Sequence, residues 1–336
     1  MENTVLKIGL AGCGHLGRIH CKLISALTAE NTSLEFAGVF DINKASAEEI
    51  AALYGVQSFA SIEELLSSVN TLVIVTPTTT HFEIACAAIK KGINVFIEKP
   101  VTSSLHQAEQ LIELARKHPV KIQVGHVERF NPALTALEKF EMKPMFIESH
   151  RLSQFNPRGT DVSVIQDLMI HDIDIILHLA GSPVEKIDAN GVAVISDEID
   201  IANARLKLKN GCVANLTASR ISLKKMRKMR IFQNNAYISV DFLNNKSEIF
   251  RLTAKDSPDD GMSFPISDEK KIVYSEAKAD SPESANPIRS ELSSFFTSIQ
   301  SDTPVKVTLE SGKEAVEVAD KIIEIIKETQ KQNTSK

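Results

Sequence analysis

Six residues near the N-terminus have the spacing of a dinucleotide-binding loop. The run Gly12-Cys13-Gly14-His15-Leu16-Gly17 follows an apolar segment and precedes a helical pattern. In that context the first glycine permits a tight turn, the second lets the backbone approach a pyrophosphate, and the third lets helix and strand pack closely. The free amides at the helix start attract phosphate oxygens. The cofactor-binding residues predicted from this run are Gly12, Gly14, His15, Leu16 and Gly17.

A carboxylate at the end of the next apolar segment bears on which dinucleotide binds. Asp41 directly follows residues 34–40, which are predicted to form a strand. It can accept hydrogen bonds from both ribose hydroxyls and would repel a 2′-phosphate, which favours NAD over NADP. Two alternatives stay open: Asp41 only starts a turn with Asn43, or Lys44 pairs with the phosphate of NADP.

Two more polar segments follow predicted strands of the same part of the chain. One runs from Thr76-Pro77 to His81 after residues 71–75, and the other is Glu98-Lys99-Pro100 after residues 94–97. Open α/β sheets bind their ligands at the carboxyl ends of parallel strands. The cofactor contacts predicted from these segments are Thr76, Pro77, His81, Glu98 and Lys99.

A carboxylate and an imidazole follow later in the chain, four residues apart. The spacing of Asp167 and His171 would place both on one face of a helix. An imidazole with an ordinary pKa of about 6.5 suits a general base near neutral pH. The same spacing also fits a surface pair or a histidine whose polar atoms are satisfied in the core.

The first third of the chain, which must position most of these residues, alternates strand and helix patterns. Strands are expected at 6–11, 34–40, 71–75, 94–97 and 121–124, and helices at 16–27, 45–54, 82–90 and 104–117. Such alternation predicts a Rossmann domain with a doubly wound parallel sheet.

The rest of the chain has a different rhythm. Consecutive strands are expected at 202–208, 213–219, 230–232 and 236–242, a loop at 255–287, and a closing helix at 312–330. This predicts an α/β domain with a mostly antiparallel open sheet. We therefore expect a dinucleotide-binding domain at 1–124 and a substrate-binding and oligomerisation domain at 125–336.

Composition excludes several classes of protein. The 336 residues are 43% hydrophobic and 24% charged without an apolar run long enough for a bilayer, so no membrane association is expected. A net charge of −5 disfavours nucleic acid. The basic run 224–230 fits the solvated face of a strand, or a contact to an anionic substrate. Four scattered cysteines and the absence of a secretory pattern predict a cytoplasmic protein, and no metal site is expected.

Together these residues resemble the Gfo/Idh/MocA oxidoreductases over nearly the whole chain. Besides the motifs above, the likeness rests on Arg129-Phe130-x-Pro132 and Gly312-x-Glu314-Ala315. It implies Lys99, Asp167 and His171 as the catalytic group, with either His171 or Lys99 as the base. It also implies NAD as cofactor and an open sheet that supports homodimers or homotetramers. The chain departs from the family pattern at Thr78, where many members have Asn, and at 163–166, where paired glycines are common.

The resemblance also bears on the substrate. The run Gly125–Pro132 looks like that of a subgroup acting on nucleotide sugars, the UDP-N-acetylglucosamine 3-dehydrogenases. The substrate contacts implied in this way are Lys99, His126, Arg129, Asn131 and His171. The arginines that could bind a diphosphate, or only decorate the exterior, are Arg129, Arg151, Arg158 and Arg220.

We therefore expect a dehydrogenase that transfers a hydride between a secondary hydroxyl of a sugar or nucleotide sugar and the nicotinamide of NAD. One alternative is a dehydrogenase of a free polyol, inositol or simple sugar. The other is a non-catalytic NAD sensor, which would not need the lysine, aspartate and histidine of the catalytic group.

Overall fold

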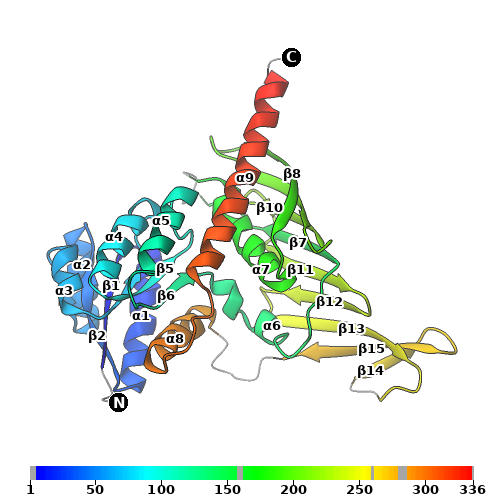
Figure 1. The fold of residues 1–336 in the computed structure, drawn as a ribbon, viewed down its shortest axis with the longest axis horizontal. Coiled ribbons are helices and arrows are strands. Elements are labelled where there is room, and N and C mark those ends of the chain that lie inside the picture. The colour runs from blue at the N-terminus through cyan, green and yellow to red at the C-terminus, as the bar shows by residue number, and fades with distance from the viewer. Residues whose placement is uncertain (1–4, 157–161, 259–260, 279–285, 335–336) are drawn as a thin grey trace. The chain divides into compact units, whose positions relative to one another are not determined.

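The computed structural model describes residues 5–156, 162–258, 261–278 and 286–334 (Figure 1). Packing groups the chain into two compact units. Unit 1 comprises Met1–Val127 and Asn286–Val316, and unit 2 comprises Glu128–Ala285 and Glu317–Lys336. This grouping differs from the expected division after residue 124 chiefly because the segment 286–316 belongs with the N-terminal part of the chain.

Unit 1 contains sheet A, six parallel strands in the order β3-β2-β1-β4-β5-β6. The strands are β1 (Leu6–Ala11), β2 (Leu34–Phe40), β3 (Gln57–Ser58), β4 (Thr71–Ile74), β5 (Asn94–Glu98) and β6 (Ile122–Gly125). The predicted doubly wound parallel sheet is confirmed, and only the two-residue strand β3 was not expected. The strand order reverses between β1 and β4, and such switch points are where open sheets bind ligands.

Several helices of unit 1 begin where short polar residues cap them. Asn43, Ser61 and Ser104 accept backbone N–H groups at the starts of α2, α3 and α5. The helices are α1 (His15–Glu30), α2 (Lys44–Tyr54), α3 (Ile62–Ser68), α4 (Thr78–Lys90), α5 (Leu105–Ala115) and α8 (Pro287–Gln300).

Helix α8 belongs to unit 1 because its apolar side chains fill the core of that unit. Leu292, Phe295 and Phe296 are buried in one cluster with residues of β1, β2, α1 and α2. In addition, the ring of Phe295 packs against Phe96 of β5, with 6.0 Å between the ring centroids. Helix α8, although it lies near the C-terminus in the sequence, is thus part of unit 1.

Unit 2 contains sheet B, nine strands in the order β14-β15-β13-β12-β11-β7-β10-β9-β8. Only β7 and β10 pair in parallel, so the expected mostly antiparallel sheet is confirmed. The strands are β7 (Phe146–Leu152), β8 (Val184–Val192), β9 (Ile201–Leu208), β10 (Val213–Ser219), β11 (Met226–Gln233), β12 (Ala236–Asp241), β13 (Lys246–Ala254), β14 (Met262–Pro265) and β15 (Lys270–Ala277).

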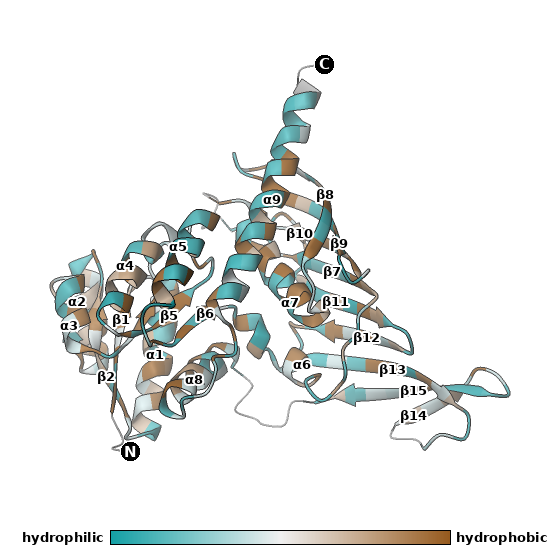
Figure 2. Ribbon diagram, viewed as in Figure 1, coloured by the Kyte–Doolittle hydropathy of each residue, from teal (hydrophilic) through white to brown (hydrophobic). Residues whose placement is uncertain are grey.

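One face of sheet B is covered by helices. Alternate residues of the central strands are buried there, among them Ile147, Ile231 and Ile249. Of the helical segments of unit 2, α6 and α7 contact this sheet, as does the turn η2 through β10. The other helical segments are η1 (Val127–Phe130), α6 (Pro132–Thr135), η2 (Ile165–Met169), α7 (Ile170–Ala180) and α9 (Leu309–Thr334), of which η1 and α9 begin in unit 1 and end in unit 2. The last turns of α9 are hydrophilic (Figure 2).

Two expectations for unit 2 have a clear outcome. The predicted loop at 255–287 is wrong in its described part, which contains β14 and β15. Its polar, charged composition hid the strands, because β14 is exposed along its whole length. The basic run lies partly in β11, where Arg227, Lys228 and Arg230 are exposed and Met229 is buried, as a solvated strand face requires. Among the described helices, none is long and apolar enough to cross a membrane.

Candidate active site

The glycines between β1 and α1 are required for different reasons. Gly12 has a φ of +102°, and a Cβ there would lie 2.6 Å from the carbonyl oxygen of Val75. A Cβ on Gly17 would lie 1.9 Å from the carbonyl oxygen of Gly12. A Cβ on Gly14 would meet no atom within 4 Å. Gly12 and Gly17 are therefore fixed by packing, whereas Gly14 borders open space.

The start of helix α1 suits a phosphate group. Gly14 is its N-cap, no side chain caps it, and its first turn contains no acidic residue. The first amides of a helix have no partner within the helix, so they are available to phosphate oxygens. Together with the open space at Gly14, this arrangement fits the pyrophosphate of a dinucleotide.

Asp41 lies beside this loop at the end of β2. Its Oδ2 accepts the N–H of Cys13 at 2.6 Å, and its Oδ1 accepts the N–H of Asn43 at 2.7 Å. The turn with Asn43 therefore exists, and each carboxylate oxygen keeps capacity for a further hydrogen bond. The ammonium of Lys44 lies 3.6 Å from Glu48 on a highly exposed side chain.

His81 joins the two loops that follow β4 and β5. Its Nδ1 lies 2.9 Å from the carbonyl oxygen of Pro100, and its Nε2 lies 2.9 Å from that of Thr76. The side chain is buried, and burial lowers the pKa of His81. The structure therefore gives this predicted cofactor contact a second task, holding one strand-end loop against the other.

Glu98 is also buried, although it was expected to contact the cofactor. Its Oε1 lies 2.9 Å from Nε2 of His20, and its Oε2 accepts the N–H of Lys99 at 3.1 Å. Sequence reasoning missed His20. The available signal was a polar residue within the buried stripe of α1, which also includes Gly17, Cys21 and Ile24.

Unit 1 thus gathers one set of predicted site residues at a single edge of sheet A. The glycine loop, Asp41, the Thr76–His81 segment, Glu98-Lys99 and His126 follow the carboxyl ends of β1, β2, β4, β5 and β6. The side chain of Lys99 is half-buried and that of His126 is buried.

The predicted site residues of unit 2 lie around the start of α7. Asp167 belongs to η2, a single π-helical turn, and His171 lies in the first turn of α7, each half-buried. The spacing of four predicted that both lie on one face of a helix, but the structure places them in helical turns of two different kinds. In a π turn the hydrogen bonds run from i to i+5, so a spacing of four is less than one turn there. Such turns occur frequently at functional sites.

Buried ion pairs hold the helix that carries His171. Arg129 binds Asp174 through two nitrogens, at 2.6 and 2.8 Å. Arg151 lies 2.7 Å from Asp172 and 2.7 Å from Glu128. Burial lowers the pKa of Arg151, but the two carboxylates outweigh it and raise the pKa above its ordinary value.

These pairs also settle where several predicted substrate contacts lie. Arg129 and Arg151 are buried and engaged by carboxylates, and buried Arg220 donates to the carbonyls of Val162 and Ile199. Asn131 is buried too and donates to Glu128 and to the carbonyl of Phe242. These arginines therefore do not decorate the exterior, and Arg158 lies outside the described residues. Sequence reasoning missed Asp172 and Asp174.

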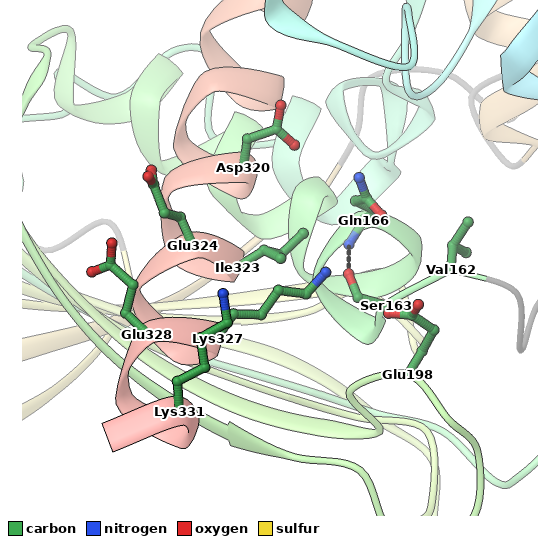
Figure 3. Close-up of a pocket in the computed structure, with 10 residues that line it drawn as sticks. All are labelled: Val162, Ser163, Gln166, Glu198, Asp320, Ile323, Glu324, Lys327, Glu328 and Lys331. Atoms are coloured by element: carbon green, nitrogen blue, oxygen red, sulfur yellow. Dashed lines mark hydrogen bonds between the residues drawn. The ribbon is translucent and has the colours of Figure 1, made fainter. Parts of the chain in front are cut away.

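Unit 2 also contains a cavity of about 510 Å³ along α9, shown in Figure 3. Its lining residues are Val162, Ser163, Gln166, Glu198, Asp320, Ile323, Glu324, Lys327, Glu328 and Lys331. None of these is a predicted site residue, and four carboxylates against two ammonium groups would repel a diphosphate. We therefore do not assign this cavity to the substrate.

A glycine loop at a switch point and an acid at the end of β2 define a dinucleotide-binding Rossmann protein. Comparison with known families identifies it further. Residues 6–126 match the oxidoreductase family with an NAD-binding Rossmann fold, and residues 144–239 match the GFO/IDH/MocA C-terminal domain. The chain belongs to this family of NAD-binding oxidoreductases.

Individual relatives show where in the family the chain falls. It is 41% identical over 254 residues to UDP-N-acetylglucosamine 3-dehydrogenase from Acidithiobacillus ferrooxidans, covering 75% of this chain and 79% of the relative. A crystal structure of that enzyme matches 96% of this chain and 97% of its own, with a TM-score of 0.84 and 34% identity. Myo-inositol 2-dehydrogenase from Thermotoga maritima is 25% identical over 330 residues, 93% of each chain.

Proposed function

We propose that this oxidoreductase oxidises a secondary hydroxyl of a nucleotide sugar, with NAD in preference to NADP. The observation that carries the proposal is the likeness to UDP-N-acetylglucosamine 3-dehydrogenase, at 41% identity over three-quarters of the chain. The inositol dehydrogenase compared above reaches 25%. A free polyol, inositol or simple sugar is the alternative substrate class.

The proposed chemistry removes a proton from the substrate oxygen and a hydride from its carbon. Bound NAD supplies the hydride acceptor. His171 takes the hydroxyl proton, Lys99 stabilises the developing alkoxide, and Asp167 orients the reacting group. The ion pairs at Asp172 and Asp174 support this assignment, because they fix the helical turn on which His171 lies.

The proposal also covers the roles of the two units and the location of the protein. Unit 1 would bind the dinucleotide, and unit 2 would supply most contacts to the sugar. All four cysteines are free thiols. Free thiols are typical of the reducing cytoplasm, which supports a cytoplasmic location.

Lys99→Ala and His171→Ala test the catalytic assignment. Each should lower kcat by about two to four orders of magnitude, because each removes a group that handles the proton or the charge in the transition state. The kcat of the double variant should be only slightly lower than that of the less active single variant. Residues that serve one transition state act as a unit, so removing the first already removes most of their joint contribution. Absorbance of reduced nicotinamide measures turnover with UDP-N-acetylglucosamine, myo-inositol and glucose.

The controls are Lys117→Ala and His106→Ala, which change the same residue types at exposed positions. His106 lies in α5 and Lys117 lies just after it. Calorimetry should give the same NAD affinity for all variants. If Lys99→Ala and His171→Ala both keep near-normal turnover on a confirmed substrate, the catalytic assignment is wrong. Turnover of inositol without turnover of the nucleotide sugar would establish the alternative substrate class.

We also propose that the uncovered face of sheet B forms a homodimer or homotetramer contact. Five rings cross five strands there, with ring centroids 5.0–5.8 Å apart: Phe146, Phe232, Tyr237, Phe250 and Tyr274. Beside Tyr237 and Phe250 a largely apolar groove of about 370 Å³ continues over Leu252 and Ile272. A large apolar patch of this kind is typical of an association surface.

Tyr237→Lys tests this contact, because a charge at the centre of the rings would be costly to bury between subunits. The wild type should have the mass of a dimer or tetramer in sedimentation, and the variant should shift towards the monomer. Glu63→Lys, on exposed helix α3, is the control and should leave the mass unchanged. A monomeric wild type would disprove the proposal.

A further inference from the structure

We infer that His20 and Glu98 form a buried pair that positions Lys99 for catalysis. The inference rests on the proposed role of Lys99 and goes beyond it, because it names a residue of α1 that no motif assigned to the site. All the residues involved belong to unit 1.

One carboxylate connects helix α1 to the backbone of Lys99. Because a carboxylate only accepts hydrogen bonds, Nε2 of His20 donates to Oε1 of Glu98 over 2.9 Å. The second oxygen of Glu98 accepts the N–H of Lys99 over 3.1 Å. His20 therefore fixes the orientation of Glu98, and Glu98 in turn fixes the peptide from which the lysine side chain extends.

The surroundings leave this carboxylate little freedom. His20 is 0% exposed and Glu98 is 7% exposed. A Cβ on Gly125 would lie 2.9 Å from Oε2 of Glu98, so the carboxylate packs against the bare backbone of β6. On the other side, the ring of His20 packs against Phe96, with 5.7 Å between centroids.

Packing alone does not explain a histidine at this position. Nδ1 of His20 is buried and has no hydrogen-bond partner among the described residues. A buried polar atom left unsatisfied costs about 1–3 kcal/mol, a cost that an apolar side chain would avoid. The hydrogen bond from Nε2 to Glu98 accounts for the residue, since it gives a donor to one oxygen of a buried carboxylate whose other oxygen accepts the N–H of Lys99.

Lys99 is held from its other side as well. The next residue, Pro100, has its carbonyl oxygen 2.9 Å from Nδ1 of His81 on α4. Two buried histidines on different helices thus act on either side of the lysine, His20 through Glu98 and His81 at the carbonyl of Pro100. When the donor at position 20 is removed, Glu98 should bind the N–H of Lys99 less firmly, whereas the contact between His81 and the carbonyl of Pro100 should remain.

Two variants that differ by one methylene test the inference. The amide nitrogen of His20→Gln can take the place of Nε2, whereas that of the shorter His20→Asn reaches only as far as Nδ1. His20→Asn should lower kcat by about 10- to 100-fold, the effect of misplacing a catalytic group, with KM and NAD affinity nearly unchanged. His20→Gln should keep most of kcat. Ile50→Ala, in the core cluster that contains Phe96, controls for lost stability.

A second readout does not depend on any substrate. Amide hydrogen exchange of a peptide covering residues 95–102 should be faster in His20→Asn than in the wild type, His20→Gln and Ile50→Ala. Equal exchange in all four proteins, or equal kcat in the Gln and Asn variants, would overturn the inference. Should Lys99→Ala keep full turnover, the proposed function fails, whereas the exchange data still report whether His20 holds this segment. If His20→Asn does not fold, Glu98→Gln replaces it in both measurements, because its single amide oxygen cannot accept from both His20 and the N–H of Lys99.

Discussion

Asp41 combines a structural task with a proposed recognition task. Its two oxygens hold the amides of Cys13 and Asn43, and so tie the glycine loop to the end of β2. The same oxygens are those that we propose to meet the ribose hydroxyls. Removing the whole side chain would therefore disturb the loop itself, and a test of cofactor choice has to keep an acceptor in place.

Asp41→Asn keeps one acceptor oxygen and removes the charge. NAD affinity should fall by about 1.5–3 kcal/mol, the contribution of a hydrogen bond to a charged group, while NADP should lose less because its phosphate is no longer repelled. Calorimetric titration with both cofactors measures the change. Lys44→Met is the matched control. Loss of NADP binding in this variant alone would show that Lys44 pairs with the 2′-phosphate. If the wild type binds NADP more tightly than NAD, the assignment of Asp41 is contradicted.

The sequence was informative about residues whose constraints are local. Gly12 and Gly17 are fixed by neighbours a few residues away or on the adjoining strand, so their spacing predicted the loop. His20 and Glu98 are 78 residues apart, and Arg129 and Asp174 are 45 apart. Those partnerships depend on how the elements pack, and no short motif encodes them.

At the scale of elements, the start of α7 shows how charge can fix a helix. Asp172 directly follows His171, Asp174 lies two residues further on, and both carboxylates are buried against arginines from other segments. A buried charge that loses its partner is far costlier than one left in water. The orientation of the helix is therefore coupled to these two pairs.

Arg129→Met should destabilise the protein by about 3–5 kcal/mol, because it leaves Asp174 buried without its partner. Thermal or urea unfolding measures the loss. Arg205→Met, at an exposed position of β9, removes an arginine of the same unit and should cost less than about 0.5 kcal/mol. Equal stability of the two variants would mean that the Arg129–Asp174 pair contributes nothing.

Elements were predictable from sequence where their periodicity was strong. The strands and helices around sheet A have continuous apolar patterns, and the structure contains each of them. The π turn at Asp167 has no periodicity of its own, and β14 has no buried face to reveal it. The sequence analysis also missed helices α3 and α8 and strands β7, β8 and β13, so a missed element is not always one without a pattern of its own.

At the scale of the whole molecule, the chain leaves unit 1 after Val127 and returns to it at Asn286. The expected division at residue 124 did not include this return, because the apolar residues of α8 do not indicate in which of the two units they are buried. Leu292, Phe295 and Phe296 complete the core around β1 and β2.

A fragment of residues 1–127 should therefore lack cooperative unfolding and bind NAD poorly. Loss of one large buried side chain costs about 2–5 kcal/mol, and this fragment lacks three. Adding residues 286–316 through a flexible glycine-serine linker of about 20 residues should restore a sharp thermal transition and NAD binding. The same fusion with Leu292, Phe295 and Phe296 replaced by serine is the control. A stable, NAD-binding 1–127 fragment would show that α8 is dispensable.

The return of α8 to the first core also sets an order of events at the ribosome. Domains usually fold in turn from the N-terminus as the chain emerges, at about 5–20 residues per second. Here the nascent unit 1 must wait for its last helix while about 160 residues of unit 2 are translated, a delay of roughly 10–30 s at that rate. During this interval the apolar surface that α8 later covers is open to chaperones. Unit 2 in turn includes residues 317–336, which are translated last, so unit 1 can complete its core as soon as α8 and the residues up to 316 have emerged.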